Sequence, residues 1–168
     1  MNEAQPGLHR LRPQEAEAVS ALARVIWQAT YPALIPQAQI DAMLADRYAP
    51  ERIREQLADP RQAWWVARRD HALAGFAHAL LDDEQGCKFD KLYVHPDQQR
   101  RGIGAALLRE VEDWARSHQA RRLWLQVNRG NTQAIRAYQK YGFRIVDSRV
   151  FDIGGGFVMD DHVMAREL

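Results

Sequence analysis

Two arginines and two glycines stand close together in the middle of the chain, where a strand-like segment gives way to a helical one. They are Arg100, Arg101, Gly102 and Gly104. The first amides of a helix lack partners within the helix and carry the positive end of its dipole, so they can bind an anion. Glycine lets a ligand approach the backbone closely, and arginine adds positive charge. The segment therefore predicts a site for a phosphate or diphosphate group.

Two common phosphate-binding patterns do not fit this segment. It lacks the third glycine of the dinucleotide-binding fingerprint and the Gly-Lys-Ser/Thr of the nucleoside-triphosphate loop, so both of those classes are disfavoured. A pair of glycines also suits tight packing of a helix against a strand. The glycines alone therefore do not decide between a ligand site and simple packing, and the elements on either side of the segment provide further evidence.

The elements around this segment alternate between strand and helix. Alternating residues before it predict a strand that stops at His95-Pro96, and apolar residues at spacings of three and four predict helices after it. In chain order the predicted elements are the strand Lys88–Val94, the helix Gly102–Ser117, the strand Leu123–Val127, the helix Thr132–Tyr141 and the strands Phe143–Phe151 and Phe157–Leu168.

The first third of the chain is mostly helical, and a hairpin follows it. The predicted elements are a short strand over Gly7–Arg12, helices from Pro13 to about Thr30, over Gln37–Ala45 and over Pro50–Leu57, and strands over Trp64–Ala67 and Ala72–Leu81. This order predicts a single domain over residues 1–168. Its fold class is α/β (α+β), a mixed sheet with helices on both faces.

Two segments of the chain resemble the signatures of one superfamily. Leu92–Gly104 closely resembles the Gln/Arg-x-x-Gly-x-Gly/Ala signature of the GNAT superfamily of N-acetyltransferases, which follows the fourth strand of that fold. Asn131–Phe143 is similar to its second signature, an Asn-x-x-Ala-x-x-x-Tyr helix that ends in Gly-Phe. The match covers about residues 88–145. The resemblance implies a splayed mixed sheet of about seven strands.

The resemblance also implies acetyl-CoA as the acetyl donor. The fourth and fifth strands of the fold part to admit the pantetheine arm as if it were an extra strand. Its amides would pair with the backbone of Leu92, Tyr93 and Val94, and Asn131 would contact the arm or the diphosphate. The residues that would hold the pyrophosphate are Gln99, Arg100, Arg101, Gly102, Ile103, Gly104 and Ala105.

Acetyl transfer from a thioester to an amine needs a donor for the developing oxyanion and an acid for the departing thiolate. Tyr138 matches the superfamily's tyrosine near the cofactor sulfur, and a phenol with a pKa of about 10 can protonate a thiolate. The oxyanion donor in this fold is commonly a backbone amide near the end of the fourth strand, which implies Val94. Tyr141 is interpreted as a packing or cofactor contact.

A base for the attacking amine is harder to place. Some relatives that acetylate protein amino termini carry a glutamate in the middle of the fifth strand, but Gln126 stands there and cannot take a proton. By two-residue alternation Asp90 shares a face with Leu92 and Val94, so it could face the active cleft and act directly or through water. A salt-bridged Asp90 and deprotonation by ordered water are the alternatives.

The amine acceptor would lie between the early helices and the last hairpin. Trp27 and Tyr31, one helical turn apart, could wall its pocket, and ordinary core packing is the alternative. Asp161, in the run Asp160-Asp161-His162, could supply negative charge for a cationic amine, and a polar strand face is the alternative. The resemblance leaves a small molecule, a polyamine or a peptide as possible acceptors.

Composition narrows the class of protein further. A net charge of +1 over 168 residues provides no strong field for nucleic acid or an anionic membrane, and no apolar run reaches the length of a membrane-spanning helix. Cys87 is the only cysteine, and the polar stretch Met1–Gly7 lacks the pattern of a secretory signal, so a cytoplasmic protein is expected. The histidines have no metal-ligand spacing, and no metal is expected. Relatives often dimerise, which makes a homodimer possible.

Three classes of function remain after these observations. The first is an enzyme that acetylates a primary amine by direct attack on acetyl-CoA. The second is a non-catalytic sensor that binds acyl-CoA with the same fold, against which Tyr138 argues. The third is a structural α/β domain without a cofactor, which the two signatures disfavour. A fold alone does not fix the substrate, because function resides in the site.

Overall fold

The computed structural model describes residues 7–168, and within them the strands form one sheet of seven. The strands are β1 Gly7–Arg10, β2 Gln62–Arg69, β3 Ala72–Leu81, β4 Gly86–Val94, β5 Arg122–Asn128, β6 Arg144–Gly154 and β7 Phe157–Glu167. Their order is β1-β2-β3-β4-β5-β7-β6, and every pairing except β4–β5 is antiparallel. The predicted mixed sheet is therefore confirmed. The prediction that no secretory signal is present falls on residues 1–6, outside the described part.

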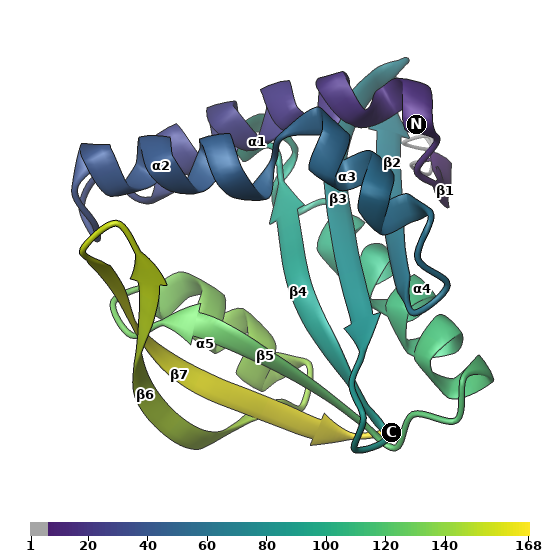
Figure 1. The fold of residues 1–168 in the computed structure, drawn as a ribbon. Helices are drawn as coiled ribbons and strands as arrows, with labels where there is room; N and C mark the ends of the chain where they lie inside the picture. The colour runs from purple at the N-terminus through teal and green to yellow at the C-terminus, as the bar shows by residue number, and fades with distance from the viewer. Residues whose placement is uncertain (1–6) are drawn as a thin grey trace.

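Helices cover both faces of the sheet (Figure 1). They are α1 Ala16–Thr30, α2 Gln37–Arg47, α3 Pro50–Leu57, α4 Ile103–Ser117 and α5 Thr132–Lys140. The first three lie over one face, and α4 and α5 lie over the other. Within residues 7–168, no helix is long and apolar enough to cross a membrane.

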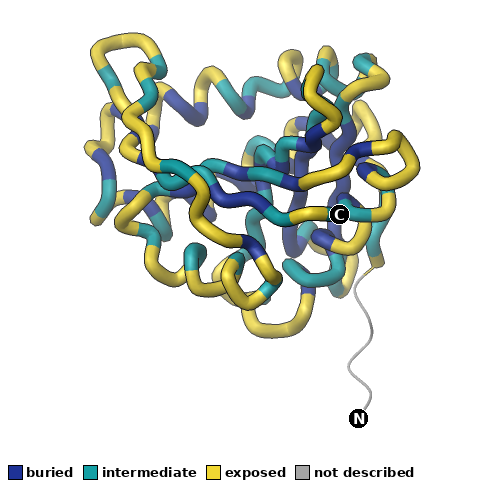
Figure 2. The backbone as a smooth tube through the Cα atoms, turned by 90° about the horizontal axis from the view of Figure 1, so that it is seen from below, coloured by how far each residue is buried: buried dark blue, intermediate teal, exposed yellow. Residues whose placement is uncertain are grey.

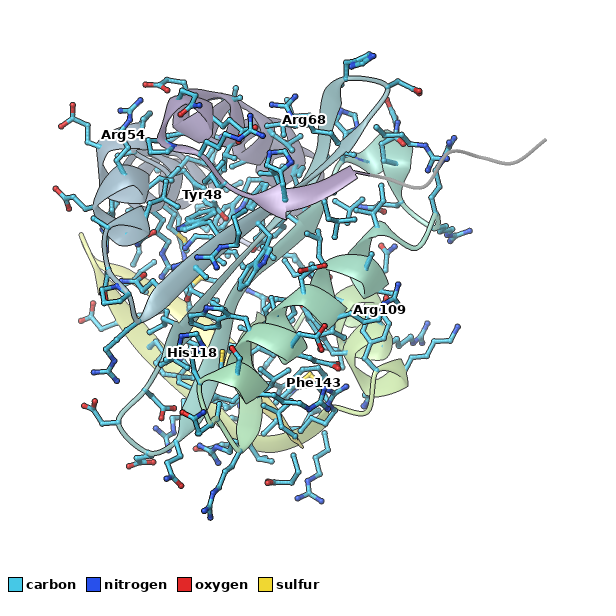
Figure 3. The ribbon with its side chains drawn as sticks, turned by 90° about the vertical axis from the view of Figure 1, so that its right-hand side faces the viewer. Tyr48, Arg54, Arg68, Arg109, His118 and Phe143 are labelled. Carbon is cyan, nitrogen blue, oxygen red and sulfur yellow. The ribbon has the colours of Figure 1, made fainter. Side chains whose placement is uncertain are left out.

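Each face of the sheet has its own hydrophobic core, because side chains alternate between the faces along a strand. Leu107 and Val111 of α4 pack into one core, and Ile26 of α1 and Ile40 of α2 pack into the other. Tyr48, which follows α2, lies between the sheet and the helices α1, α2 and α3 (Figure 3). Figure 2 shows that the buried residues gather in the middle of the molecule and that the turns are exposed.

Strands β4 and β5 separate from one another over most of their length (Figure 1). They pair only where Gly86, Cys87 and Lys88 stand opposite Arg122, Leu123 and Trp124. Beyond that point β5 stays paired with β7 up to Asn128, whereas β4 stays paired with β3 up to Val94. The sheet is thus splayed, as the sequence predicted, and a gap opens beside the last residues of β4.

A bulge in β4 changes the face on which Asp90 lies. His78 of β3 pairs with Lys91 and Ala79 pairs with Phe89, so Asp90 is an extra residue in the ladder. Such an extra residue interrupts the two-residue alternation. Leu92 packs with the core under α4, whereas the Asp90 carboxylate contacts Lys91 and His78 on the opposite face. The prediction that Asp90 shares a face with Leu92 and Val94 is wrong for this reason.

Candidate active site

The turn between β4 and α4 has the backbone of an anion site. Arg100 and Gly102 both adopt positive φ, at 65° and 79°, and α4 begins directly afterwards at Ile103. No side chain caps this end of the helix, and the first bond of the helix runs from the Ala106 amide to the Gly102 carbonyl. The amides of the first turn are left for another acceptor, at the positive end of the helix dipole.

The turn is tied to the end of β4 by side chains. Gln99 Nε2 donates to the Val94 carbonyl at 3.4 Å, and the Asp97 amide donates to His95 Nδ1 at 3.0 Å. A Cβ built on Gly104 would lie 3.8 Å from the Tyr141 hydroxyl and 3.9 Å from Val94 Cγ2. The predicted pyrophosphate residues, from Gln99 to Ala105, are therefore brought together in one turn and the first turn of a helix.

The open edge of β4 is formed by the backbone of alternate residues. The His95 amide donates to the Ala74 carbonyl of β3 at 2.7 Å. Because backbone groups alternate in direction along a strand, those of Val94 and Leu92 point away from β3, into the gap. The Tyr93 carbonyl faces β3, 2.8 Å from the position of a Cβ on Gly75. Of the three residues predicted to pair through their backbone, only Leu92 and Val94 direct it into the gap.

Helix α5 places Tyr138 on the α4 side of the gap. Asn131 caps the helix, since its Oδ1 accepts a bond from the Ala134 amide at 3.3 Å, and Tyr138 packs edge-on against Phe143 with ring centroids 5.7 Å apart. Burial, and then the neighbouring tyrosines Tyr31 and Tyr141, raise the pKa of the Tyr138 phenol above its ordinary value. The phenol is therefore protonated at neutral pH and can act as a proton donor.

Two tyrosines, one at the end of α1 and one in β4, meet on the other side of the gap. The hydroxyls of Tyr31 and Tyr93 are 2.9 Å apart. Trp27 packs behind them, with its ring centroid 4.5 Å from that of Tyr31, and its indole nitrogen donates to the Tyr48 hydroxyl. Trp27 is only 3% exposed, so the structure places it in the core, and Tyr31 carries the polar group nearer the gap.

Asp161 lies in β7, opposite Asn128 of β5 and Arg149 of β6. Its side chain is 5% exposed, and its Oδ1 atom has no hydrogen-bond partner in the described part of the chain. Burial raises the pKa of this carboxyl to about 6, although Arg47 acts in the opposite direction. Asp161 is therefore a buried acid without the partners that a structural carboxylate normally has.

Two cavities flank these residues on the face that α1, α2 and α3 cover. The first has a volume of about 790 Å³ and lies over β5, β6 and β7, with Trp124, Gln126 and Val163 in its wall. The second, of about 630 Å³, lies between α2, α3, β4 and the tip of the β6–β7 hairpin, and Asp90 and Lys91 line it. Both walls carry charges of both signs. No group of three His, Cys, Asp or Glu residues within 7–168 is arranged to hold a metal ion.

The family follows from a comparison with known proteins. Residues 23–143 match the profile of the Acetyltransferase (GNAT) family. The chain belongs to this family. An uncharacterised N-acetyltransferase of Mycobacterium bovis is 36% identical over 152 residues, which cover 90% of this chain and 96% of the relative. The protein is thus an N-acetyltransferase, as its two signature segments predicted.

Other relatives show how widely the GNAT fold is shared. A spermidine N(1)-acetyltransferase of Thermoplasma acidophilum is 23% identical over 91% of this chain and 94% of its own length. The crystal structure of the PaiA N-acetyltransferase from the same organism, in complex with coenzyme A, has a TM-score of 0.85 at 21% identity and covers 98% of this chain and all of that one. The Escherichia coli ribosomal-protein-S18-alanine N-acetyltransferase has a TM-score of 0.70 at 21% identity and covers 97% of this chain and 94% of its own. These likenesses concern the fold.

The ion pairs of Asp90 match the salt-bridged alternative that the sequence left open, but the sequence did not predict its partners. Asp90 Oδ2 lies 2.6 Å from Lys91 Nζ and 3.1 Å from His78 Nδ1, and its other oxygen lies 3.1 Å from Lys88 Nζ. Burial alone would raise the pKa of Asp90, but Lys91, His78 and Lys88 hold it well below its usual range. A carboxylate this strongly paired is a weak base. The charged residues between Lys88 and Lys91, in an otherwise apolar strand, were the signal in the sequence that could have indicated this cluster.

Proposed function

We propose that this GNAT protein transfers the acetyl group of acetyl-CoA to a primary amine of a small molecule, polyamine or peptide by direct attack. The observation that carries the proposal is the gap beside β4, which has an anion-binding turn near one end and Tyr138 at its side. The exposed backbone of Leu92 and Val94 supports pairing with the pantetheine amides. The uncapped end of α4 supports binding of the pyrophosphate.

The residues around the gap suit the steps of the transfer. The Val94 amide, which points into the gap, would donate a hydrogen bond to the oxygen of the thioester as negative charge develops there. Tyr138 would give its proton to the departing thiolate. Asn131, whose side chain caps α5, would contact the cofactor with the part of the amide that the cap leaves available.

The acceptor would enter from the face that α1 and α2 cover. The cavity of about 790 Å³ has room for an extended amine, and Asp161 would attract the ammonium group. Tyr31 would line the path beside it. The named relatives act on acceptors of two kinds, spermidine and a ribosomal protein, which supports a polyamine or a peptide amino terminus as the first acceptors to test.

The first experiment is an assay of free-thiol release from acetyl-CoA with polyamines, aminoglycosides, amino acids and short peptides as acceptors. Calorimetric titration of CoA into the same sample measures cofactor binding. We expect CoA to bind and one class of amine to turn over. Tight CoA binding without turnover across the panel would favour the sensor, and absence of CoA binding would contradict the proposal altogether.

Gly102 offers a direct test of the pyrophosphate site. We expect Gly102→Ala to weaken acetyl-CoA binding by roughly 10-fold, equivalent to about 1.4 kcal/mol. A Cβ on Gly102 would meet no protein atom within 4 Å, so the added methyl would occupy space that the proposal gives to the diphosphate. The positive φ of 79° should also cost about 1–2 kcal/mol of stability. Calorimetry and chemical denaturation measure the two effects.

Gly156 provides the matched control for Gly102. Its φ is +80°, and a Cβ there would also meet nothing within 4 Å. Gly156→Ala should therefore lose a similar amount of stability and keep its affinity for acetyl-CoA. Equal affinities for the two variants would mean that the turn does not hold the diphosphate.

We also propose that the enzyme is cytoplasmic and forms a homodimer. A single buried cysteine suits a reducing compartment, in which acetyl-CoA is available. Strand β6 is at the edge of the sheet and exposes Ile145, Val146 and Val150. An exposed apolar edge strand is a natural place for pairing with another chain, and a second copy is the proposed partner.

A further inference from the structure

The reaction proposed above needs a group that removes a proton from the amine, and two polar residues near the gap are unsuited to it. Gln126 lies in β5 and lines the larger cavity, but an amide does not accept a proton at neutral pH. Asp90 is held by Lys88, Lys91 and His78, which keep it ionised and occupied. A base has to come from another element of the fold.

Strand β7 places Asp161 next to residues that line the larger cavity, although Asp161 is not itself in the cavity wall. Met159 and Val163 share its face of the strand, because side chains alternate along β7. Met159 packs in the core beneath α1, α2 and α3, and Val163 lines the cavity of about 790 Å³. Asp161 therefore lies where the helix-covered core ends and the cavity begins. Arg149, its cross-strand neighbour, also lines that cavity.

One oxygen of the Asp161 carboxylate, Oδ1, lacks a hydrogen-bond partner in the described part of the chain. The residue is 5% exposed. Burying a polar group without a partner costs stability, so such a group in a native protein needs another explanation. A ligand that donates hydrogen bonds, such as an ammonium group, would supply the missing partner.

The charged and titratable groups around Asp161 come from several elements. Arg47 of α2 and Lys88 of β4 favour its ionised form, whereas burial and Asp160 oppose it. Tyr31, which directly follows α1, interacts with it electrostatically, and the Tyr31 hydroxyl is 2.9 Å from that of Tyr93. Arg149 directs its Nε to Asp147 at 2.5 Å. Tyr31 thus interacts electrostatically with Asp161 and also with Tyr138, which lies on the other side of the gap.

We infer that Asp161 is the general base of the acetyltransferase, a role that rests on the proposed function. One N–H bond of the bound ammonium breaks, and its proton goes to the Asp161 carboxylate. The amine lone pair then forms a C–N bond with the thioester carbonyl carbon while the carbonyl π electrons move to oxygen. Collapse of this adduct breaks the C–S bond, the sulfur keeps the electron pair, and the Tyr138 proton converts the thiolate to free CoA. The nitrogen, which is still positively charged, loses its second proton to the Tyr138 phenolate; this restores the phenol and leaves a neutral amide. Asp161 later releases its proton to solvent.

Asp161→Asn tests the role, and Asp160→Asn is the matched control, because Asp160 is exposed and pairs with Arg129 at 2.8 Å. With the panel amine that turns over fastest, we expect Asp161→Asn to lower kcat/KM at pH 7 by about 100-fold or more. Acetyl-CoA affinity should stay within about 2-fold in both variants, and Asp160→Asn should keep its activity. Wild-type kcat/KM should decrease as the pH falls below about 6, because the base becomes protonated. The pH profile of Asp161→Asn should lack this acid limb.

Two further measurements separate a base from a residue that only binds the ammonium. Formate added to Asp161→Ala should restore part of the activity, because it supplies a carboxylate in the vacated space. At pH 8, Asp161→Asn should melt at a higher temperature than the wild type, since a buried unpaired charge is gone. A lower melting temperature, or a raised KM with unchanged kcat and the acid limb intact, would overturn the inference. Absence of wild-type turnover with every amine would instead refute the proposed function and this role with it.

Discussion

Tyr138→Phe should lower kcat for acetyl transfer by about 100-fold or more while acetyl-CoA affinity stays within about 2-fold. The phenylalanine ring can keep the edge-on contact with Phe143, at a centroid distance of 5.7 Å in the wild type. The substitution removes only the proton donor. Because burial raises the pKa of the Tyr138 phenol, the wild-type residue holds its proton until the thiolate forms. Steady-state kinetics and calorimetry on the same preparations measure the two quantities.

Tyr141→Phe provides the comparison for Tyr138→Phe. Tyr141 is one helical turn further on, and its hydroxyl lies 3.8 Å from a Cβ built on Gly104, in the first turn of α4. We expect this variant to keep its kcat, with any change confined to acetyl-CoA affinity. Equal loss of binding and turnover in Tyr138→Phe would refute the assignment of Tyr138 as the acid.

Asp90→Ala should lower the free energy of unfolding by about 3–5 kcal/mol, the range observed when one partner is removed from a buried ion pair. Asp90 is the only anion within hydrogen-bond distance of Lys91 in the part of the chain that the structure describes, and Lys91 is only 6% exposed. Its removal leaves a buried ammonium beside the rings of Tyr48 and Trp64. Urea denaturation measures the loss. Asp46→Ala, which breaks an exposed pair with Arg52, should change stability little.

The same cluster predicts how stability depends on acidity. The pKa of Asp90 is lower in the folded protein than in the unfolded chain, where an aspartate titrates at about 3.9. Its contribution is therefore fully present above about pH 4 and is lost as the pH falls through the lower, folded pKa. We expect the stability difference between wild type and Asp90→Ala to shrink on acidification below about pH 4. A constant difference would mean that lost packing, rather than lost charge, destabilises the variant.

The sequence predicted the part of the fold whose pattern is periodic and unbroken. The spacing of Ile103, Leu107, Leu108 and Val111 predicts α4, and the structure buries all four. The last two strands were predicted with a break between residues 151 and 157, and the structure places the turn of that hairpin there, with Gly154, Gly155 and Gly156 at positive φ. Local signals of this kind need no knowledge of distant parts of the chain.

The rest of the site depends on contacts that no local pattern records. The bulge at Asp90 adds one residue between polar neighbours, so the alternation of apolar and polar residues gives no sign of it. The pairing of Tyr31 with Tyr93 joins residues 62 positions apart. The surroundings of Asp161 combine residues from several strands and helices that lie far apart in the sequence. The sequence could name this aspartate as a charge but could not show that it is buried.

Because β4 and β5 pair over only a short junction, a bound cofactor would stabilise the association of the two parts of the sheet. Three residue pairs join the first four strands to the last three, and the two groups separate beyond them. An acetyl-CoA molecule in the gap would bond to β4 and to the start of α4, and through α5 to the carboxyl-terminal half. By mass action, cofactor at 100 times its Kd would add about 2.7 kcal/mol to the free energy of unfolding. Amide hydrogen exchange should record this gain most strongly in β5 and α5, because the bound cofactor would hold the two groups of strands together beyond their short junction.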